Sequence, residues 1–353
     1  MVNGGRHGSA AVGMTQLDEF DDVIDVRSPA EFALDHVPGA VNCPALDNEE
    51  RARVGTLYKQ VSAFEARKVG AALVARNVAR HLETQFCRRD KAWKPLVYCW
   101  RGGKRSASMA HVLREVGWAA ATLEGGYQHY RRAVLAQLEA LPARLDWRVL
   151  CGATGSGKSR LLQCLAACGA QVLDLEALAQ HRGSVLGDMP GVPQPSQKMF
   201  DSLVWNALRR FDAARPVFVE AESRKIGAVR VPERLLACMR ASTALRVQAP
   251  LAERVRFLIA EYRDRLEQPE WLKTQLQRLA TLHSHETLAR WLAQIDGREW
   301  NELVADLLET HYDPAYLRSM GKSYPSLGES RIIELPRLDQ HSLETAARAL
   351  IKG

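Results

Sequence analysis

The segment that most restricts the fold of this chain is a glycine-rich octapeptide near its middle, GATGSGKS from Gly152 to Ser159. It matches the phosphate-loop pattern G-x-x-x-x-G-K-S at every fixed position. The apolar run 147–150 precedes it and the helix-forming stretch 160–167 follows it, so it joins a predicted strand to a predicted helix. Glycines there leave backbone N–H groups free to surround phosphate oxygens. We therefore expect a phosphate site formed by Gly152, Gly155, Ser156, Gly157, Lys158 and Ser159.

Lys158 supplies the positive charge of this loop, and the Ser159 hydroxyl is a candidate Mg²⁺ ligand, although no firm metal site is predicted. Three carboxylates follow predicted strands and either bind Mg²⁺ through water or are plain surface groups: Asp174, Glu220 and Glu222. The usual second motif of nucleotide hydrolases ends in Asp. Glu at 220 and 222 therefore argues against ordinary ATP hydrolysis. Any diphosphate presents the same oxygens, so the ligand is either a nucleotide or another diphosphate.

The second half of the chain reads as an α/β domain with a parallel sheet. Apolar runs at 147–150, 170–173, 216–219 and 245–247 are separated by helical stretches, as parallel strands with crossover helices require. The chain is almost entirely helix-forming over about 250–312, and 332–335 predicts a last strand.

A second reactive loop lies in the first half, where Cys99 follows the apolar strand 95–98 and precedes a helix predicted from about Ser106 to Val116. Backbone N–H groups and the helix N-terminus can converge on the sulfur there. Nearby cations should lower the pKa of the thiol and favour the nucleophilic thiolate. The predicted catalytic group is Cys99 with Arg101, Lys104 and Arg105.

Length and composition place these loops in two domains, since 353 residues exceed one average core. We expect a flexible lead-in at 1–15, one domain at 16–140, and another at 146–353 whose helical extension covers about 250–312. A net charge of +7 favours a polyanionic partner such as nucleic acid. Seven cysteines without a C-x-x-C pair, and no membrane-length apolar run, predict a cytoplasmic protein with reduced thiols and no membrane association.

The first half resembles the rhodanese family. The resemblance rests on Asp25-Val26-Arg27, on Glu31-Phe32, on HVPGAVN at 36–42 and on LEGG at 123–126 with Tyr130. It implies a domain that carries sulfur or selenium on Cys99 as a persulfide or perselenide. The same loop also reads C-x5-R with Arg105, the pattern of cysteine phosphatases that share this fold, although Tyr98 replaces the histidine that often precedes their cysteine.

A rhodanese-like domain followed by a P-loop domain resembles the bacterial tRNA 2-selenouridine synthase family. Further segments carry the resemblance: HRGSVLG at 181–187, QPSQK at 194–198, EAESRKIG at 220–227 and HYDP at 311–314. It implies a transferase that converts 2-thiouridine at the tRNA wobble position to 2-selenouridine through an S-geranylated intermediate, with Cys99 as perselenide carrier. Selenophosphate and geranyl diphosphate would be the substrates, tRNA the partner, and the enzyme that supplies selenophosphate a candidate second partner.

Two other functions stay open from the residues alone. One is a cysteine phosphatase or sulfurtransferase fused to a nucleotide-hydrolysing domain, and the other is a non-catalytic, nucleotide-regulated RNA-binding protein. Four arginines at 254, 256, 263 and 265 would suit an RNA groove, but Glu253, Glu261 and Asp264 are interleaved with them. A salt-bridged helix surface is the preferred interpretation of that stretch.

Overall fold

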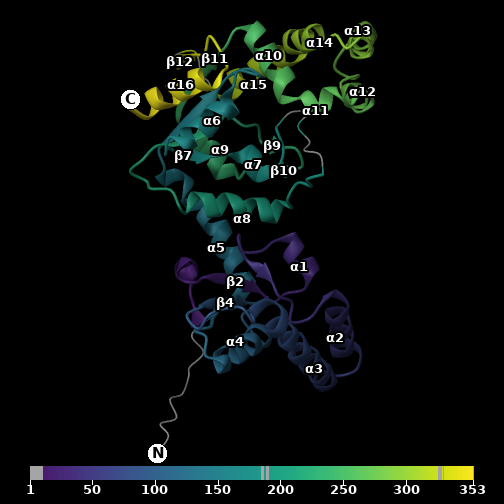
Figure 1. Ribbon diagram of the computed structural model, residues 1–353, viewed down its shortest axis with the longest axis vertical. Helices are drawn as coiled ribbons and strands as arrows, with labels where there is room; N and C mark the ends of the chain where they lie inside the picture. The colour runs from purple at the N-terminus through teal and green to yellow at the C-terminus, as the bar shows by residue number, and fades with distance from the viewer. Residues whose placement is uncertain (1–10, 184–186, 188–190, 325–327, 329, 353) are drawn as a thin grey trace, which may run out of the picture. The chain divides into compact units, whose positions relative to one another are not determined.

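The computed structural model describes residues 11–183, 187, 191–324, 328 and 330–352. The chain forms two compact units (Figure 1). The first comprises residues up to Leu138 together with Pro195–Asn206, and the second comprises Glu139–Gln194 and Ala207–Gly353.

The first unit is built on a parallel five-stranded sheet of order β1-β5-β4-β2-β3. Its strands are β1 (Ala11–Val12), β2 (Asp22–Asp25), β3 (Val41–Asn42), β4 (Pro95–Tyr98) and β5 (Ala121–Leu123). Its helices are α1 (Pro29–Leu34), α2 (Asn48–Gln60), α3 (Ala63–His81), α4 (Lys104–Val116), α5 (Gly126–Ala140) and most of α8 (Gln197–Leu208). All four side chains of the central strand β4 are buried, so its carboxyl end holds Cys99 in a fixed place.

Two features of this unit differ from the sequence-based division. Residues 1–10 lie outside the described part of the chain, but Ala11 and Val12 pair with Thr122 and Leu123, so a strand begins within the expected lead-in. Residues 195–206 belong to this unit because α8 contacts it through polar and aromatic groups. The Trp205 indole donates to the Gln137 side chain at 2.7 Å and packs edge-on against Tyr130.

The second unit holds another parallel five-stranded sheet, of order β12-β11-β6-β8-β7. Its strands are β6 (Trp147–Cys151), β7 (Gln171–Leu173), β8 (Val217–Glu220), β11 (Thr243–Gln248) and β12 (Arg331–Glu334). The helices α6 (Lys158–Ala167), α7 (Leu175–Ala179), α9 (Glu233–Arg240) and α16 (Gln340–Lys352) accompany the sheet. The predicted α/β class with parallel sheets is thus confirmed. This unit also contains a short antiparallel hairpin, β9 (Lys225–Ile226) with β10 (Val229–Arg230).

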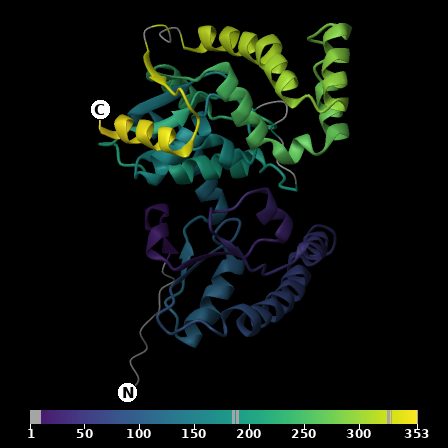
Figure 2. The same ribbon diagram turned by 45° about the horizontal axis from the view of Figure 1, so that its top comes forward.

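A group of helices follows β11 (Figure 2). It has its own apolar core. It contains α10 (Leu251–Glu261), α11 (Arg263–Leu266), α12 (Pro269–Gln277), α13 (His285–Asp296), α14 (Trp300–Leu307) and α15 (Asp313–Ser323), with a π-helical turn at Leu308–Tyr312. Trp291 and Leu276 are fully buried at its centre. Among the described residues, no helix has the length and apolar character that crossing a membrane requires.

Candidate functional site

The phosphate loop lies between β6 and α6, where the sequence predicted it. Gly157 adopts φ +83°, a left-handed conformation that side chains rarely take. At Gly152 a Cβ atom would come within 2.6 Å of the Val247 carbonyl oxygen, so the close approach of β11 requires glycine there. The Lys158 ammonium donates to the Gly152 and Ala153 carbonyls at 2.7 and 3.3 Å, which holds it over the loop.

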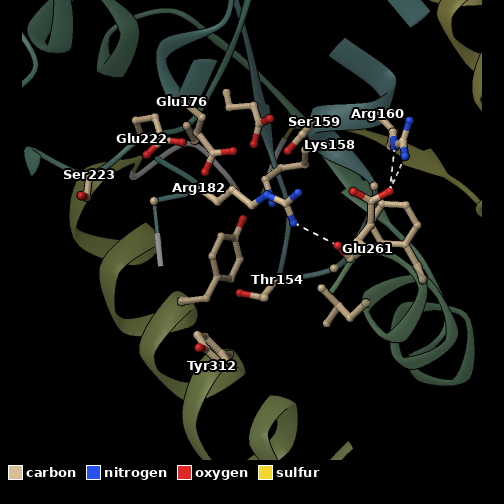
Figure 3. A pocket seen from close by; sticks show the side chains of 18 of the residues that line it. Thr154, Lys158, Ser159, Arg160, Glu176, Arg182, Glu222, Ser223, Glu261 and Tyr312 are labelled. Atoms are coloured by element: carbon tan, nitrogen blue, oxygen red, sulfur yellow. Dashed lines mark hydrogen bonds and ion pairs between the residues drawn. The ribbon is translucent and has the colours of Figure 1, made fainter. Parts of the chain in front are cut away.

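A cavity of about 670 Å³ opens beside this loop and is acidic on one side. Five carboxylates line it: Asp174, Glu176, Glu220, Glu222 and Glu261. Figure 3 shows the side chains of Glu176 and Glu222 pointing toward one another, with Tyr312 across the cavity. Sequence reasoning missed Glu176, which lies in the first turn of the short helix α7 that Asp174 caps. A second carboxylate within an Asp-capped turn was the available signal.

Burial raises the pKa of three of these carboxyl groups, those of Glu176, Glu220 and Glu222. Desolvation, and secondarily the charge of Glu220, raises the pKa of Glu176 to about 8. Desolvation and the neighbouring Glu176 raise the pKa of Glu222 well above its ordinary value. Burial also raises the pKa of Glu220, while Lys158 and a hydrogen bond with Ser159 oppose that rise. Among the described residues, no three His, Cys, Asp or Glu side chains are arranged to hold a metal ion.

The raised pKa of Glu176 predicts a pH-dependent stability. Between pH 4.5 and about 8 the folded chain holds a proton that the unfolded chain has lost, so stability falls as pH rises through this window. We expect the thermal midpoint to drop by a few degrees between pH 6 and pH 9, and Glu176→Gln to reduce that drop. Glu302→Gln, at an exposed position of the same unit, is the control and should keep the wild-type profile. Superimposable profiles for Glu176→Gln and wild type would contradict the assignment.

A small apolar pocket of about 70 Å³ adjoins the main cavity. The two share the lining residues Thr154, Leu258, Tyr262 and Tyr312. The other lining residues of the small pocket come from the helical group and are nearly all apolar: Arg265, Leu266, Trp271, Leu272, Leu303, Val304, Leu307 and Leu308. A ligand whose phosphates lie on the loop would therefore have apolar surface next to it.

Two of the four arginines of this helical region, Arg254 and Arg256, form ion pairs. The buried Arg254 binds both carboxylate oxygens of Asp313, at 2.9 and 2.6 Å, and donates to the Thr154 carbonyl at 2.9 Å. Arg256 pairs with Glu253, and Arg265 lies 4.1 Å from the centre of the Trp271 ring. Arg254 thus braces the phosphate loop against α15.

The cysteine loop of the first unit joins β4 to α4. Cys99 is 3% exposed, and its sulfur accepts hydrogen bonds from the Gly103 amide and the Ser106 hydroxyl, each at 3.2 Å. Ser106 was missed as a site residue by sequence reasoning, although it occupies the first turn of α4, where a hydroxyl can reach back to the loop. Gly126 has φ +57°, and a Cβ atom there would collide with the Cys99 carbonyl oxygen.

The three predicted cations lie on this loop and the start of α4, and two of them have other partners. Arg101 donates to the Gln128 side chain at 3.1 Å, and Arg105 lies 3.8 Å from Glu31. Lys104 is the exposed first residue of α4. All three therefore lie on the loop and its helix, where an anion approaching Cys99 would meet them.

A buried polar network lies in the same unit as the cysteine loop. Arg27 is 1% exposed, binds Asp25 through both carboxylate oxygens and donates to the Asp35 carbonyl. The Asp35 carboxylate accepts from Tyr127 at 2.7 Å and from Ser202 of α8 at 2.8 Å. The Asp-Val-Arg signature thus has a structural role here.

The remaining sequence segments divide between the two units. Arg182 and Gly183 line the main cavity, whereas residues 184–186 of the same segment lie outside the described residues. Ser223 lines the cavity beside Glu220 and Glu222. In the 194–198 segment, the Ser196 hydroxyl donates to the Leu34 carbonyl in the first unit, and the Gln194 amide donates to Ala179 and Ile226 in the second.

Comparisons with known proteins match both halves of the chain. Residues 11–133 match the rhodanese-like domain family, and residues 145–298 match the family described as the tRNA 2-selenouridine synthase AAA domain. A tRNA 2-selenouridine synthase of Nitrosomonas europaea is 39% identical over 246 residues, which cover 68% of this chain and 63% of that protein. The chain thus spans less than two thirds of that relative's length.

Two further relatives align over most of both chains. The tRNA 2-selenouridine synthase of Aeromonas salmonicida is 32% identical over 336 residues. The aligned region covers 85% of this chain and 88% of that protein. That of Hydrogenovibrio crunogenus is also 32% identical, with coverages of 87% and 93%.

Proposed function

Because this chain belongs to the tRNA 2-selenouridine synthase family, we propose that it is a tRNA-modifying transferase that converts wobble 2-thiouridine to 2-selenouridine through S-geranyl-2-thiouridine. The proposed substrates are tRNA, geranyl diphosphate and selenophosphate. We place the reaction in the cytoplasm, where the Cys99 thiol stays reduced.

The observation that carries the first step is the phosphate loop with an apolar pocket beside it. A nucleoside diphosphate would bring a polar ribose next to Leu258 and Trp271, whereas a prenyl diphosphate would bring a hydrocarbon chain. In this step the thiouridine sulfur attacks C1 of the geranyl group, the C1–O bond breaks, and the N3 proton of the base is released. Loop amides and Lys158 stabilise the charge that develops on the departing diphosphate.

The residues beside the loop also fit a Mg²⁺ ion. The Ser159 hydroxyl and the Glu220 carboxylate are hydrogen-bonded to one another at the edge of the loop, and both are oxygen donors that Mg²⁺ accepts. The ion would neutralise diphosphate charge. Two protein oxygens suffice because Mg²⁺ usually keeps several waters and binds substrate phosphates.

The proposed second step uses Cys99 as the selenium carrier. The terminal selenium of a Cys99 perselenide attacks C2 of the geranylated base, and the C2–S bond breaks to release geranylthiolate. A second thiol then cleaves the S–Se bond at the Cys99 sulfur, which frees the 2-selenouridine and leaves that thiol joined to Cys99 as a mixed disulfide. The selenium of selenophosphate attacks the Cys99 sulfur of this disulfide, the thiol departs, and hydrolysis of the Se–P bond restores the perselenide and releases phosphate. The assay must therefore contain a small thiol. Arg101, Lys104 and Arg105 would hold the selenophosphate anion that supplies the selenium.

Mass spectrometry of nucleosides tests the proposal. Thiolated tRNA incubated with the protein, geranyl diphosphate, selenophosphate and a thiol should yield S-geranyl-2-thiouridine first and 2-selenouridine later. A rhodanese-fold phosphatase would instead hydrolyse an aryl phosphate and leave the base unchanged. A nucleotide-regulated RNA-binding protein would bind the tRNA with a strong salt dependence and produce neither nucleoside.

A further inference from the structure

A groove in the first unit is lined by residues that, apart from Lys104 and Arg105, belong to neither site described above. It has a volume of about 1,290 Å³ and is bounded by α2, α3 and α4. Small and apolar side chains of α3 line it, namely Ala71, Val74, Ala75 and Val78, together with Gly70. Pockets for drug-sized ligands usually measure about 300–1,000 Å³, so this groove has room for more than one small molecule.

The charged groups along this groove are all basic. The lining residues, all within the described part of the chain, include Arg51, Lys59, Arg67, Lys104, Arg105 and His111 but no Asp or Glu. Glu31 and Glu115 face some of these bases from outside the lining: Glu31 lies 2.9 Å from Arg51 and 3.8 Å from Arg105, and Glu115 lies 3.8 Å from His111. Residues 48–81 contain seven Lys and Arg against three Glu, so the α2–α3 region accounts for much of the net charge of +7.

The groove begins at the cysteine loop. Lys104 and Arg105 line it, and they follow the Cys99 loop directly as the first residues of α4. Tyr58, on α2, is 64% exposed and also lines the groove, where it offers an aromatic face to an unstacked base. A ligand in the groove would therefore lie next to the helix that follows the proposed selenium carrier.

We propose that this groove receives the S-geranylated anticodon loop of the tRNA, with RNA phosphates along its basic side chains and the geranyl chain on the α3 surface. This inference rests on the proposed function, because only the alkylated intermediate combines a polyanionic strand with a hydrocarbon chain. The basic side chains of the groove favour an RNA strand. The geranyl chain would cover the apolar α3 surface, which RNA alone would leave exposed. An acidic protein partner is the alternative occupant, and the experiment below would reveal it.

Binding of synthetic anticodon stem-loops to the full chain tests the groove without the enzyme's own chemistry. One RNA carries 2-thiouridine and the other carries the same base alkylated chemically with a geranyl group. The wild-type protein should bind the geranylated RNA about tenfold more tightly than the thiolated RNA. Equal affinities would overturn the assignment of the α3 surface.

The basic side chains are tested with Lys59→Gln/Arg67→Gln, neither of which belongs to the proposed catalytic group. This variant should lower the affinity for both RNAs about tenfold. It should also reduce the magnitude of the slope of log affinity against log salt by roughly one to two. The control is Arg53→Gln/Arg76→Gln, which removes two exposed arginines from the same helices outside the groove lining. Equal losses for the two variants would show a diffuse charge effect, and the groove would be rejected as the binding site.

The α3 surface is tested with Ala71→Gln/Ala75→Gln, since both positions are exposed and Gln forms helices nearly as well as Ala. This variant should lose the preference for geranylated RNA while binding the thiolated RNA nearly as the wild type does. Ala72→Gln, exposed on α3 but outside the groove lining, is the control and should keep the preference.

The outcomes separate this inference from the proposed function. If the wild type forms both modified nucleosides but the groove variants bind RNA as the controls do, only the groove is rejected. If the wild type binds neither RNA, the groove inference is overturned with the tRNA substrate itself. RNA binding that both groove variants retain in full would leave an acidic protein as the occupant of the groove.

Discussion

Lys158→Ala should lower the rate of tRNA geranylation by about 10²–10³-fold, the usual effect of removing one preorganised group that stabilises a developing negative charge. The Lys158 ammonium lies over the carbonyls of Gly152 and Ala153, beside the loop amides that would bind the departing diphosphate. Single-turnover formation of S-geranyl-2-thiouridine, followed by mass spectrometry, measures the rate.

Two comparisons give this result its meaning. Arg160→Ala also removes a cation from the cavity lining, but Arg160 is held by Glu261, so its rate should fall only a few-fold. Lys158→Ala should still insert selenium into tRNA that was geranylated chemically, because that step does not release a diphosphate. A wild-type geranylation rate in Lys158→Ala would contradict the proposal that the phosphate loop takes part in geranylation.

The parts of both sites that were predictable are those encoded within one strand–loop–helix unit. Gly152 to Ser159 and the Cys99 loop each contain their glycines, their reactive side chain and their helix start within a few residues. Local backbone chemistry therefore places them, whatever the rest of the chain does. The alternation of apolar runs with helical stretches likewise predicted the parallel sheet of the second unit.

What the sequence did not reveal depends on residues far apart in the chain. Glu176 belongs to the site because β7 and β8 are neighbours in the sheet, which places its helix beside Glu220. The apolar pocket requires helices separated by about forty residues to pack together. Ser202 reaches Asp35 across 167 positions, and no local pattern distinguishes that serine from a solvated one.

The same limit explains why each loop alone leaves its chemistry open. A cysteine among cations suits a sulfur carrier or a phosphatase, and a phosphate loop suits a nucleotide or another diphosphate. For the phosphate loop, tertiary structure supports the proposed prenyl diphosphate over a nucleotide. Leu258, Tyr262 and Tyr312 line both the phosphate cavity and the apolar pocket. Whether the cysteine loop is a sulfur carrier or a phosphatase site is tested by an experiment at Cys99.

Cys99→Ser should abolish 2-selenouridine formation, with a loss of about 10³-fold or more, and should leave geranylation at the wild-type rate. Serine keeps the size of the side chain and the hydrogen bonds from Gly103 and Ser106, but it cannot carry selenium. S-geranyl-2-thiouridine should therefore accumulate in the nucleoside mass spectrum. Cys87→Ser, at an exposed cysteine of the same unit, is the control and should form both nucleosides normally. Normal selenium insertion by Cys99→Ser would mean that selenophosphate reacts with the base directly, with the loop cations serving only to bind it.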